Sequence, residues 1–171
     1  MWRMSAPAGE VMEEADAVSL CSLHAGGEIF GIDTKRIREV LGVRAAQRVP
    51  LAPGYIGGVV PYRGEVLTAV SFRALLGMAP YEATSCILVL EEEEAGAHFG
   101  LMVDSVGGVV TVSKGALEAN PTTLDERGKA IFDGAYKTAK GLIVQLDTRK
   151  LRPGWIEASG MCRESGQGGG R

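Results

Sequence analysis

Few residues in this sequence have the types and spacing that acid–base catalysis requires. In a cleft, Glu39, Asp104 and Asp147 could serve as general acid and base. However, Asp104 and Asp147 stand at the ends of predicted strands, where an aspartate ordinarily caps or forms a turn. The sequence contains no nucleophile elbow, no Gly-x-x-x-x-Gly-Lys loop and no His-Glu-x-x-His motif. A small β-barrel enzyme therefore stays open as an alternative without a catalytic motif, and we expect neither enzymatic activity nor a cofactor.

Candidate metal ligands are equally sparse. The run Glu91–Glu94 could chelate a cation, although adjacent carboxylates on a turn are usually a solvated charge run. His24 and His98 flank predicted strands without ligand partners at useful spacing, which favours structural roles. The cysteines are widely spaced and form no Cys-x-x-Cys pair, which favours reduced, structural thiols: Cys21, Cys86 and Cys162. We therefore expect no metal site.

The remaining candidate is Arg63, a charge at the tip of an apolar hairpin. Val59–Val60 and Val66–Leu67 predict two strands, and Pro61–Gly64 predicts the turn between them. Gly64 can adopt the backbone conformation that a tight turn needs. Because a rigid hairpin aims its tip residue, Arg63 is the first candidate for contact with a partner.

The elements around this hairpin are predicted to be mostly strands. Further strands are expected at 18–23, 28–32, 86–90, 97–103, 109–112, 131–136 and 142–146. Asn120–Arg127 is polar and predicts a loop. The abundance of glycine, 24 residues, and the low aromatic content, 6%, also favour a β-rich fold with tight turns.

Short helices are predicted between some of these strands. Asp33 is expected to cap a helix whose apolar face carries Ile37, Val40 and Leu41 at helical spacing. Ser71 is expected to cap a second helix, which Gly77 ends in a left-handed conformation. Helical turns are also expected after Ser113 and Asp147.

The overall composition limits the class of partner. The 171 residues are 46% hydrophobic and 23% charged, with a net charge of −3, so a globular fold is expected and nucleic acid is not favoured. The strands are aliphatic, whereas a nucleic-acid-binding barrel, which stays open as an alternative, would interleave basic and aromatic residues. No apolar run approaches the roughly 18 residues of a membrane span. Met1–Asp16 lacks the apolar block of a signal peptide, so a cytoplasmic protein without direct membrane insertion is expected.

The chain is expected to divide into a disordered segment 1–16, a folded region 17–156 and a flexible Gly-rich tail 157–171. A weak internal duplication runs through the folded region. Ile29–Ile32 has an echo in His98–Leu101, and Arg63–Gly64 has one in Lys140–Gly141. The paired hairpins suggest two similar small β-barrels.

At this point the sequence resembles the CheW-type coupling domain of bacterial chemotaxis over about Val18–Leu151. The segments that carry the resemblance follow one another through both halves: 31–33, 37–40, 53–59, 63–66, 99–106, 133–135 and 142–147. The resemblance implies a mainly β fold of two SH3-like barrels without a catalytic centre. The first barrel is expected at about 17–80 and the second at about 84–151, with strand exchange between them allowed.

The resemblance also implies a function. CheW-type proteins are adaptors that bridge transmembrane chemoreceptors to the regulatory domain of the histidine kinase CheA, so both are expected partners, and recruitment to membrane-associated receptor arrays is expected. Glu39 and Arg63 match family positions that contribute to the receptor-facing surface, and Gly58 matches the glycine ahead of the Arg-Gly turn. We expect Ile37, Gly58 and Val59 to form an apolar floor there, edged by Glu39 and Arg63, on which a receptor's helical tip docks.

One departure from the family pattern falls inside this surface. Pro61–Tyr62 stands where Asn-Leu is usual before Arg-Gly, so the asparagine position loses its backbone N–H and Tyr62 is expected to present a larger ring to the partner. This change indicates a divergent paralogue devoted to one receptor–kinase pathway.

Overall fold

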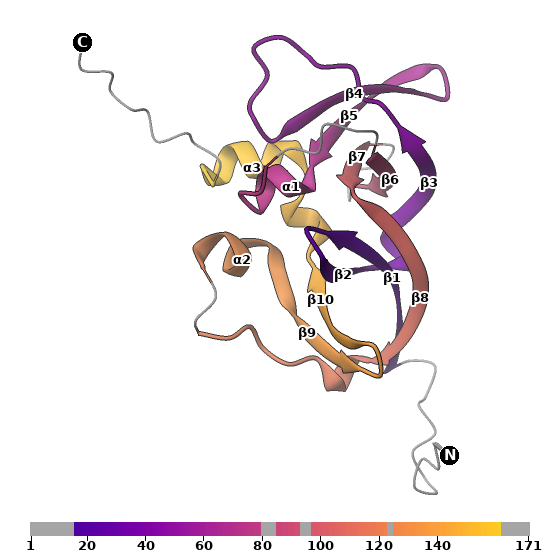
Figure 1. Cartoon of the computed structure of the whole chain (residues 1–171), viewed down its shortest axis with the longest axis vertical. Helices are drawn as coiled ribbons and strands as arrows, with labels where there is room; N and C mark the ends of the chain where they lie inside the picture. The colour runs from indigo at the N-terminus through magenta and orange to yellow at the C-terminus, as the bar shows by residue number, and fades with distance from the viewer. Residues whose placement is uncertain (1–15, 80–84, 93–96, 123–124, 162–171) are drawn as a thin grey trace, which may run out of the picture.

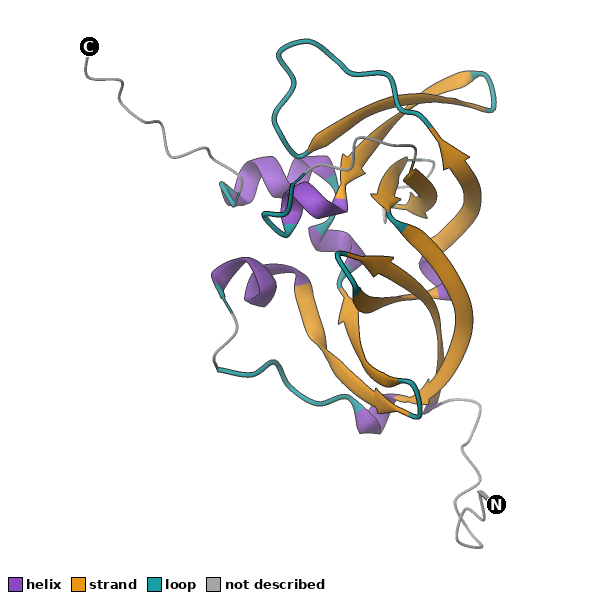
Figure 2. Cartoon of the chain, viewed as in Figure 1, coloured by secondary structure: helices purple, strands orange, loops and turns teal. Residues whose placement is uncertain are grey.

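The computed structural model describes residues 16–79, 85–92, 97–122 and 125–161, and within them the chain forms two five-stranded β-sheets (Figure 1). Short helices lie at strand ends and between strands (Figure 2). The fold is therefore mainly β, as predicted. Residues 1–15 and 162–171, which contain nearly all of the predicted disordered segment and most of the predicted tail, lie outside the described residues.

The first sheet has the strand order β8-β1-β2-β10-β9. Its neighbours are antiparallel except β2 and β10, which run parallel. The strands are β1 (Ala17–Ala25), β2 (Glu28–Asp33), β8 (Ser105–Ser113), β9 (Phe132–Thr138) and β10 (Gly141–Leu146).

The second sheet has the strand order β3-β6-β7-β5-β4. Here β5 and β7 are the parallel pair. The strands are β3 (Ile37–Arg44), β4 (Ile56–Tyr62), β5 (Glu65–Ser71), β6 (Ser85–Glu91) and β7 (His98–Val103).

The two sheets are not the two halves of the chain, so the contiguous division into 17–80 and 84–151 does not describe them. The N-terminal hairpin β1–β2 pairs with β8 and β10, and β6–β7 completes the sheet that β3, β4 and β5 begin. The long pairing of β1 with β8 explains this arrangement, because it runs from Ala17↔Ser113 to His24↔Ser105. Each sheet thus takes strands from both halves of the sequence.

The internal duplication is visible in the register of the strands. In the parallel pairs, Gly31 lies opposite Gln145 in one sheet and Gly100 lies opposite Ala69 in the other. The first sequence echo is therefore structurally equivalent. The second echo is displaced by one residue. The pairs Tyr62↔Glu65 and Thr138↔Gly141 close the two turns, so Arg63 is structurally equivalent to Ala139 rather than to Lys140.

The described residues form three apolar clusters, of which the largest holds the two sheets together. The largest packs residues of both sheets with all three α-helices, α1 (Phe72–Leu75), α2 (Glu126–Ile131) and α3 (Pro153–Ser159). Phe30 of the first sheet meets Phe72 there edge-on, with ring centroids 4.8 Å apart. Two smaller clusters fill the individual barrels, around Tyr136 in the first sheet and around Tyr62 in the second.

The predicted helix with Ile37, Val40 and Leu41 on one face is wrong. Asp33 does cap a turn, since its carboxylate accepts the Lys35 N–H at 2.9 Å, but this turn is a 3-10 helix, η2, of only Thr34–Arg36. The chain then becomes β3, in which Ile37 and Leu41 point inward and Val40 is 43% exposed. Pairing with β6 overrides the local pattern, which fits a helix and a strand about equally well over so few residues.

Two helices, α2 and α3, were missed, and α3 crosses the predicted boundary at residue 156 between the folded region and the tail. Asp125 accepts the Gly128 N–H at 2.8 Å and begins α2, where a loop and then a strand were predicted. Pro153 at the first turn and Gly160 at φ 67° delimit α3, and Ile156 of this helix is buried in the main cluster. By contrast, Ser71 and Asp147 cap their helical turns as predicted, whereas Ser113 makes no capping bond.

Candidate functional site

Three of the six predicted site residues come together at one corner of the second sheet. Glu39 Oε2 accepts a hydrogen bond of 2.9 Å from the Tyr62 hydroxyl and one of 3.1 Å from Arg63 Nη2. The Arg63 guanidinium also lies over the Tyr62 ring, 5.5 Å from its centroid. We call Glu39, Tyr62 and Arg63 the tip cluster. It joins β3 to the end of β4 and the turn that follows, and β3 and β4 are the two edge strands of this sheet.

A tight turn aims the arginine. Arg63 and Gly64 have φ of 48° and 80°, and the pair Tyr62↔Glu65 closes a two-residue hairpin, as in a type I′ turn. The turn thus lies one residue later than predicted. A non-glycine residue at positive φ is strained, so Arg63 occupies a position that Asn or Gly would fill more readily.

The expectation that Tyr62 presents its ring to a partner is wrong. Tyr62 is the last residue of β4 rather than a turn residue, and strand alternation turns it inward, leaving it 5% exposed. Its role is to hold Glu39. The groups that remain at the surface are the side chains of Arg63, 66% exposed, and Glu39, 38% exposed.

The tip cluster keeps both of its charges. The Tyr62 hydroxyl, followed by the Arg63 guanidinium, lowers the pKa of Glu39 by hydrogen bonding to the carboxylate, and the charges of Arg63 and Arg44 add to the effect. The bond to Glu39 raises the pKa of Arg63. The result is a fixed, ionised pair at the surface.

Replacing Tyr62 by phenylalanine should raise the pKa of Glu39 towards its ordinary value, because the first of the stabilising hydrogen bonds disappears. Glu39 titrates at a lower pH in the wild type than in Tyr62→Phe, and carboxyl carbon NMR resonances measured against pH report the difference. The Tyr136→Phe variant, altered in the other barrel, is the matched control and should leave Glu39 unchanged. Identical Glu39 titration in wild type and Tyr62→Phe would contradict the assignment.

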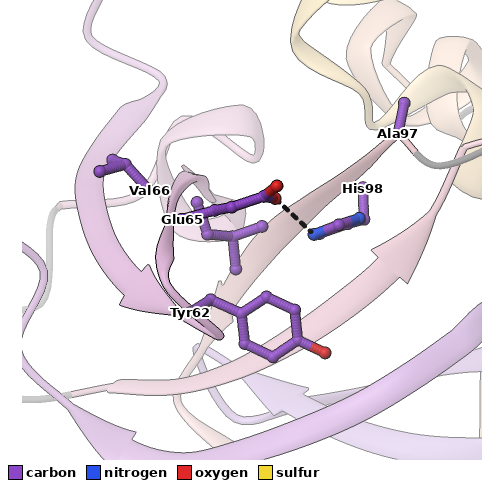
Figure 3. A pocket seen from close by; sticks show the side chains of 6 residues that line it. Tyr62, Glu65, Val66, Ala97 and His98 are labelled. Carbon is purple, nitrogen blue, oxygen red and sulfur yellow. Dashed lines mark ion pairs between the residues drawn. The ribbon is translucent and has the colours of Figure 1, made fainter.

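Tyr62 also lines a pocket of about 180 Å³, together with Glu65 and His98 (Figure 3). His98 meets the Tyr62 ring edge-on at 5.4 Å and lies 4.0 Å from the Glu65 carboxylate. The wall also includes Val66, Leu67 and Ala97. His98 therefore packs against Tyr62 of the tip cluster, and the spacing of these residues in the sequence did not predict this contact.

The other predicted site residues are not an open apolar floor. Gly58, at φ 145°, is buried beneath the preceding loop, and a Cβ there would come within 2.5 Å of the Gln47 carbonyl oxygen. Ile37 is half-buried and packs against the main cluster. Val59 is half-buried and exchanges two backbone hydrogen bonds with Gln47. These residues shape the backbone that carries the tip cluster.

The three carboxylates considered for acid–base chemistry each have a different arginine partner. Glu39 bonds Arg63, and Asp104 bonds Arg73 Nε at 2.7 Å. Burial alone would raise the pKa of Asp147, but hydrogen bonds of 3.0 and 2.9 Å from the Arg149 side chain outweigh it and lower that pKa. The pKa values of all three are lowered, whereas a general acid or base needs one raised towards neutrality.

Metal and thiol chemistry find little support in the described part of the chain. It contains no group of three His, Cys, Asp or Glu residues placed to hold a metal ion. Glu93, Glu94 and Cys162 lie outside the described residues. Cys21 is buried, and burial raises the pKa of its thiol, as for a small apolar residue. In the described ranges, no helix has the length and apolar character that a bilayer crossing requires.

These features define a β-barrel binding module whose most distinctive surface group is a clamped arginine. The comparisons with known proteins agree. The family model described as "CheW-like domain" matches residues 19–152, so this chain belongs to the CheW-like family. Proteins of this family are coupling adaptors of bacterial chemotaxis.

Individual relatives support the assignment. The chain is 30% identical over 131 residues to a chemotaxis protein CheW of Rhizobium meliloti, covering 75% of this chain and 84% of that protein. It is 25% identical to a CheW of Treponema pallidum, covering 77% and 80%. The crystal structure of the scaffolding protein TtCheW from Thermoanaerobacter tengcongensis superposes with a TM-score of 0.68 at 24% identity, covering 78% of this chain and 91% of that one. The fold is thus the pair of SH3-like subdomains expected from the sequence.

Proposed function

We propose that this protein couples the cytoplasmic tip of a chemoreceptor to the regulatory domain of a CheA-type histidine kinase, and that the receptor docks at the tip cluster. An adaptor acts through binding free energy and geometry, without chemistry of its own. The paired arginines and lowered pKa values of the candidate carboxylates support a non-catalytic role. Assembly into membrane-associated receptor arrays is part of the proposal, since weak individual contacts gain strength through multivalency.

The single observation that carries the receptor site is the clamped arginine. Arg63 is 66% exposed yet held by a two-residue turn and by Glu39 at 3.1 Å. A pre-positioned guanidinium loses little side-chain entropy when a partner carboxylate or carbonyl binds it. Arginines with these properties are common among the residues that dominate binding energy.

Replacing Arg63 by glutamate should weaken binding of a purified receptor-tip fragment at least tenfold, or about 1.4 kcal/mol, because the charge that meets the partner is reversed. Isothermal titration calorimetry measures the affinity, and thermal melting checks the fold. Lys140→Glu makes the same charge change in the equivalent exposed hairpin of the first sheet and should bind as the wild type does.

Arg63→Asn separates function from stability. Asparagine tolerates positive φ better than arginine, so this variant should be at least as stable as the wild type while losing receptor-tip affinity. If both Arg63 variants bound the receptor tip with wild-type affinity, the tip cluster would not be the docking site.

A further inference from the structure

The loop between β3 and β4 carries a leucine that contributes nothing to the packing of its own barrel. Leu51 is 104% exposed, and its backbone has φ 64°, a left-handed conformation. Such a conformation is uncommon for a bulky side chain. Strain of this kind persists where the surrounding structure enforces it, and it marks functional sites more often than ordinary surface.

The surrounding structure does enforce it. The Ala52 N–H donates to the Val49 carbonyl at 3.3 Å, which closes a β-turn with Pro50 and Leu51 at its centre. Proline followed by a residue at positive φ is the pattern of a type II turn, in which Gly or Asn normally takes the place of Leu51. The bond from the Ile56 N–H to the Pro53 carbonyl, 2.9 Å, then anchors the end of the loop to β4.

The loop differs in charge from the rest of the molecule. The loop contains Arg48, Arg44 ends the strand that leads into it, and residues 44–53 include no acidic residue, although the whole chain has a net charge of −3. Both arginines are exposed, and Val49, beside the turn, is 41% exposed. Leu51 therefore stands at the tip of an apolar projection, and the chain that leads to this tip carries the positive charges of Arg44 and Arg48.

The turn that carries Leu51 lies apart from the tip cluster, although Arg44, before the loop, acts on the charge of Glu39. The loop enters β4 at Ile56, whereas Arg63 follows its last residue, Tyr62. Seven residues of extended chain span about 20 Å. In Figure 1 the loop arches away from the sheet at one end of β4, opposite the β4–β5 turn. One protein domain can contact the loop while another occupies the tip cluster.

We propose that Leu51 inserts into a shallow apolar pocket, surrounded by carboxylates, on the surface of a folded partner protein. We call Leu51 and the turn that carries it the finger. A bilayer is the weaker candidate, because one leucine and one half-exposed valine bury too little apolar area to anchor a protein of this size. The inference rests on the proposed function in one respect: the finger serves the adaptor's second partner, for which the kinase regulatory domain is the probe.

Leu51→Asn tests the finger, because asparagine suits the left-handed turn position and removes the apolar group. Binding is measured to three probes: the purified regulatory domain of the CheA-type kinase, the receptor-tip fragment, and anionic phosphatidylglycerol vesicles. We expect the melting temperature to rise by about 1–4 °C as strain is relieved. Affinity for the kinase domain should fall at least tenfold, with receptor-tip affinity unchanged.

Two further variants sharpen the experiment. Leu51→Met keeps an apolar side chain and should retain kinase-domain affinity within about threefold, since volume-conserving apolar changes are well tolerated. Leu142→Thr removes a leucine that is 57% exposed on the first sheet and should leave binding unchanged.

The inference is overturned if Leu51→Asn binds the kinase domain as the wild type does, or if only vesicle or receptor-tip binding is lost. Wild-type binding to both protein probes, insensitive to Leu51, would leave the proposed function standing and remove the finger. A wild type that binds neither protein would end both.

Discussion

Replacing Gly58 by alanine lowers the free energy of unfolding by about 2–4 kcal/mol, because two costs add at this position. The backbone has φ 145°, which side-chain-bearing residues rarely adopt, and the new Cβ would lie 2.5 Å from the Gln47 carbonyl oxygen. That oxygen accepts the Val59 N–H at 2.8 Å, so relieving the clash would also break a backbone bond that holds the loop on β4. Urea denaturation followed by circular dichroism measures the effect.

Gly64→Ala is the matched control for this prediction. Gly64 also has positive φ, 80°, but no atom lies within 4 Å of the position a Cβ would take. Only the conformational cost applies, so the loss should be about 1 kcal/mol. Gly134→Ala should behave like Gly58→Ala, because its Cβ would meet the Glu118 carbonyl oxygen in the equivalent place of the other barrel. Equal stability of Gly58→Ala and Gly64→Ala would show that the loop does not cover Gly58 closely.

The Asp104→Asn variant should lose about 2 kcal/mol of stability at neutral pH. Asp104 lies between β7 of one sheet and β8 of the other, bonds Arg73 at 2.7 and 2.8 Å, and accepts the Gly26 N–H at 3.0 Å. Removing one member of a buried ion pair costs about 3–5 kcal/mol, and the smaller value here reflects side chains that are 21% and 19% exposed. Urea denaturation at neutral pH measures the loss.

This loss should depend on pH in a defined direction. The hydrogen bonds from Arg73, before any other cause, lower the pKa of Asp104 in the folded state. A carboxyl group with a lowered folded pKa stabilises the protein above its unfolded pKa, about 3.9, and that stability is lost as the pH falls through the folded pKa. The difference between wild type and Asp104→Asn should therefore be complete at neutral pH and shrink below about pH 4.

The exposed ion pair Lys137–Glu118 provides the contrast. Its atoms are 3.0 Å apart, but the side chains are 75% and 54% exposed. Glu118→Gln should change stability by at most about 0.5 kcal/mol, since solvent screens such pairs. An Asp104→Asn variant no less stable than Glu118→Gln would show that Asp104 does not link the two sheets.

The site illustrates what sequence reasoning could find. Arg63 was identified because a lone charge at the tip of an apolar hairpin is a local pattern, and the resemblance to the CheW-type domain then added Glu39. The contact between Glu39 and Tyr62 was not predictable, because residues 23 positions apart meet only when the two edges of the sheet approach each other. The Leu51 turn gave no local signal, because a type II turn normally has Gly or Asn after the proline, and only the backbone angle and the exposure of Leu51 reveal it.

By itself, the sequence determined the strand and turn chemistry, the caps at Ser71 and Asp147, the mainly β class and the resemblance to the CheW-type family, since each depends on neighbouring residues or on their order along the chain. Tertiary structure alone decided that Ile37–Arg44 is a strand, that β1 and β2 join the sheet of the C-terminal segment, and that Tyr62 faces inward. Short apolar patterns fit more than one local conformation, and pairing between distant strands supplies the free energy that selects among them.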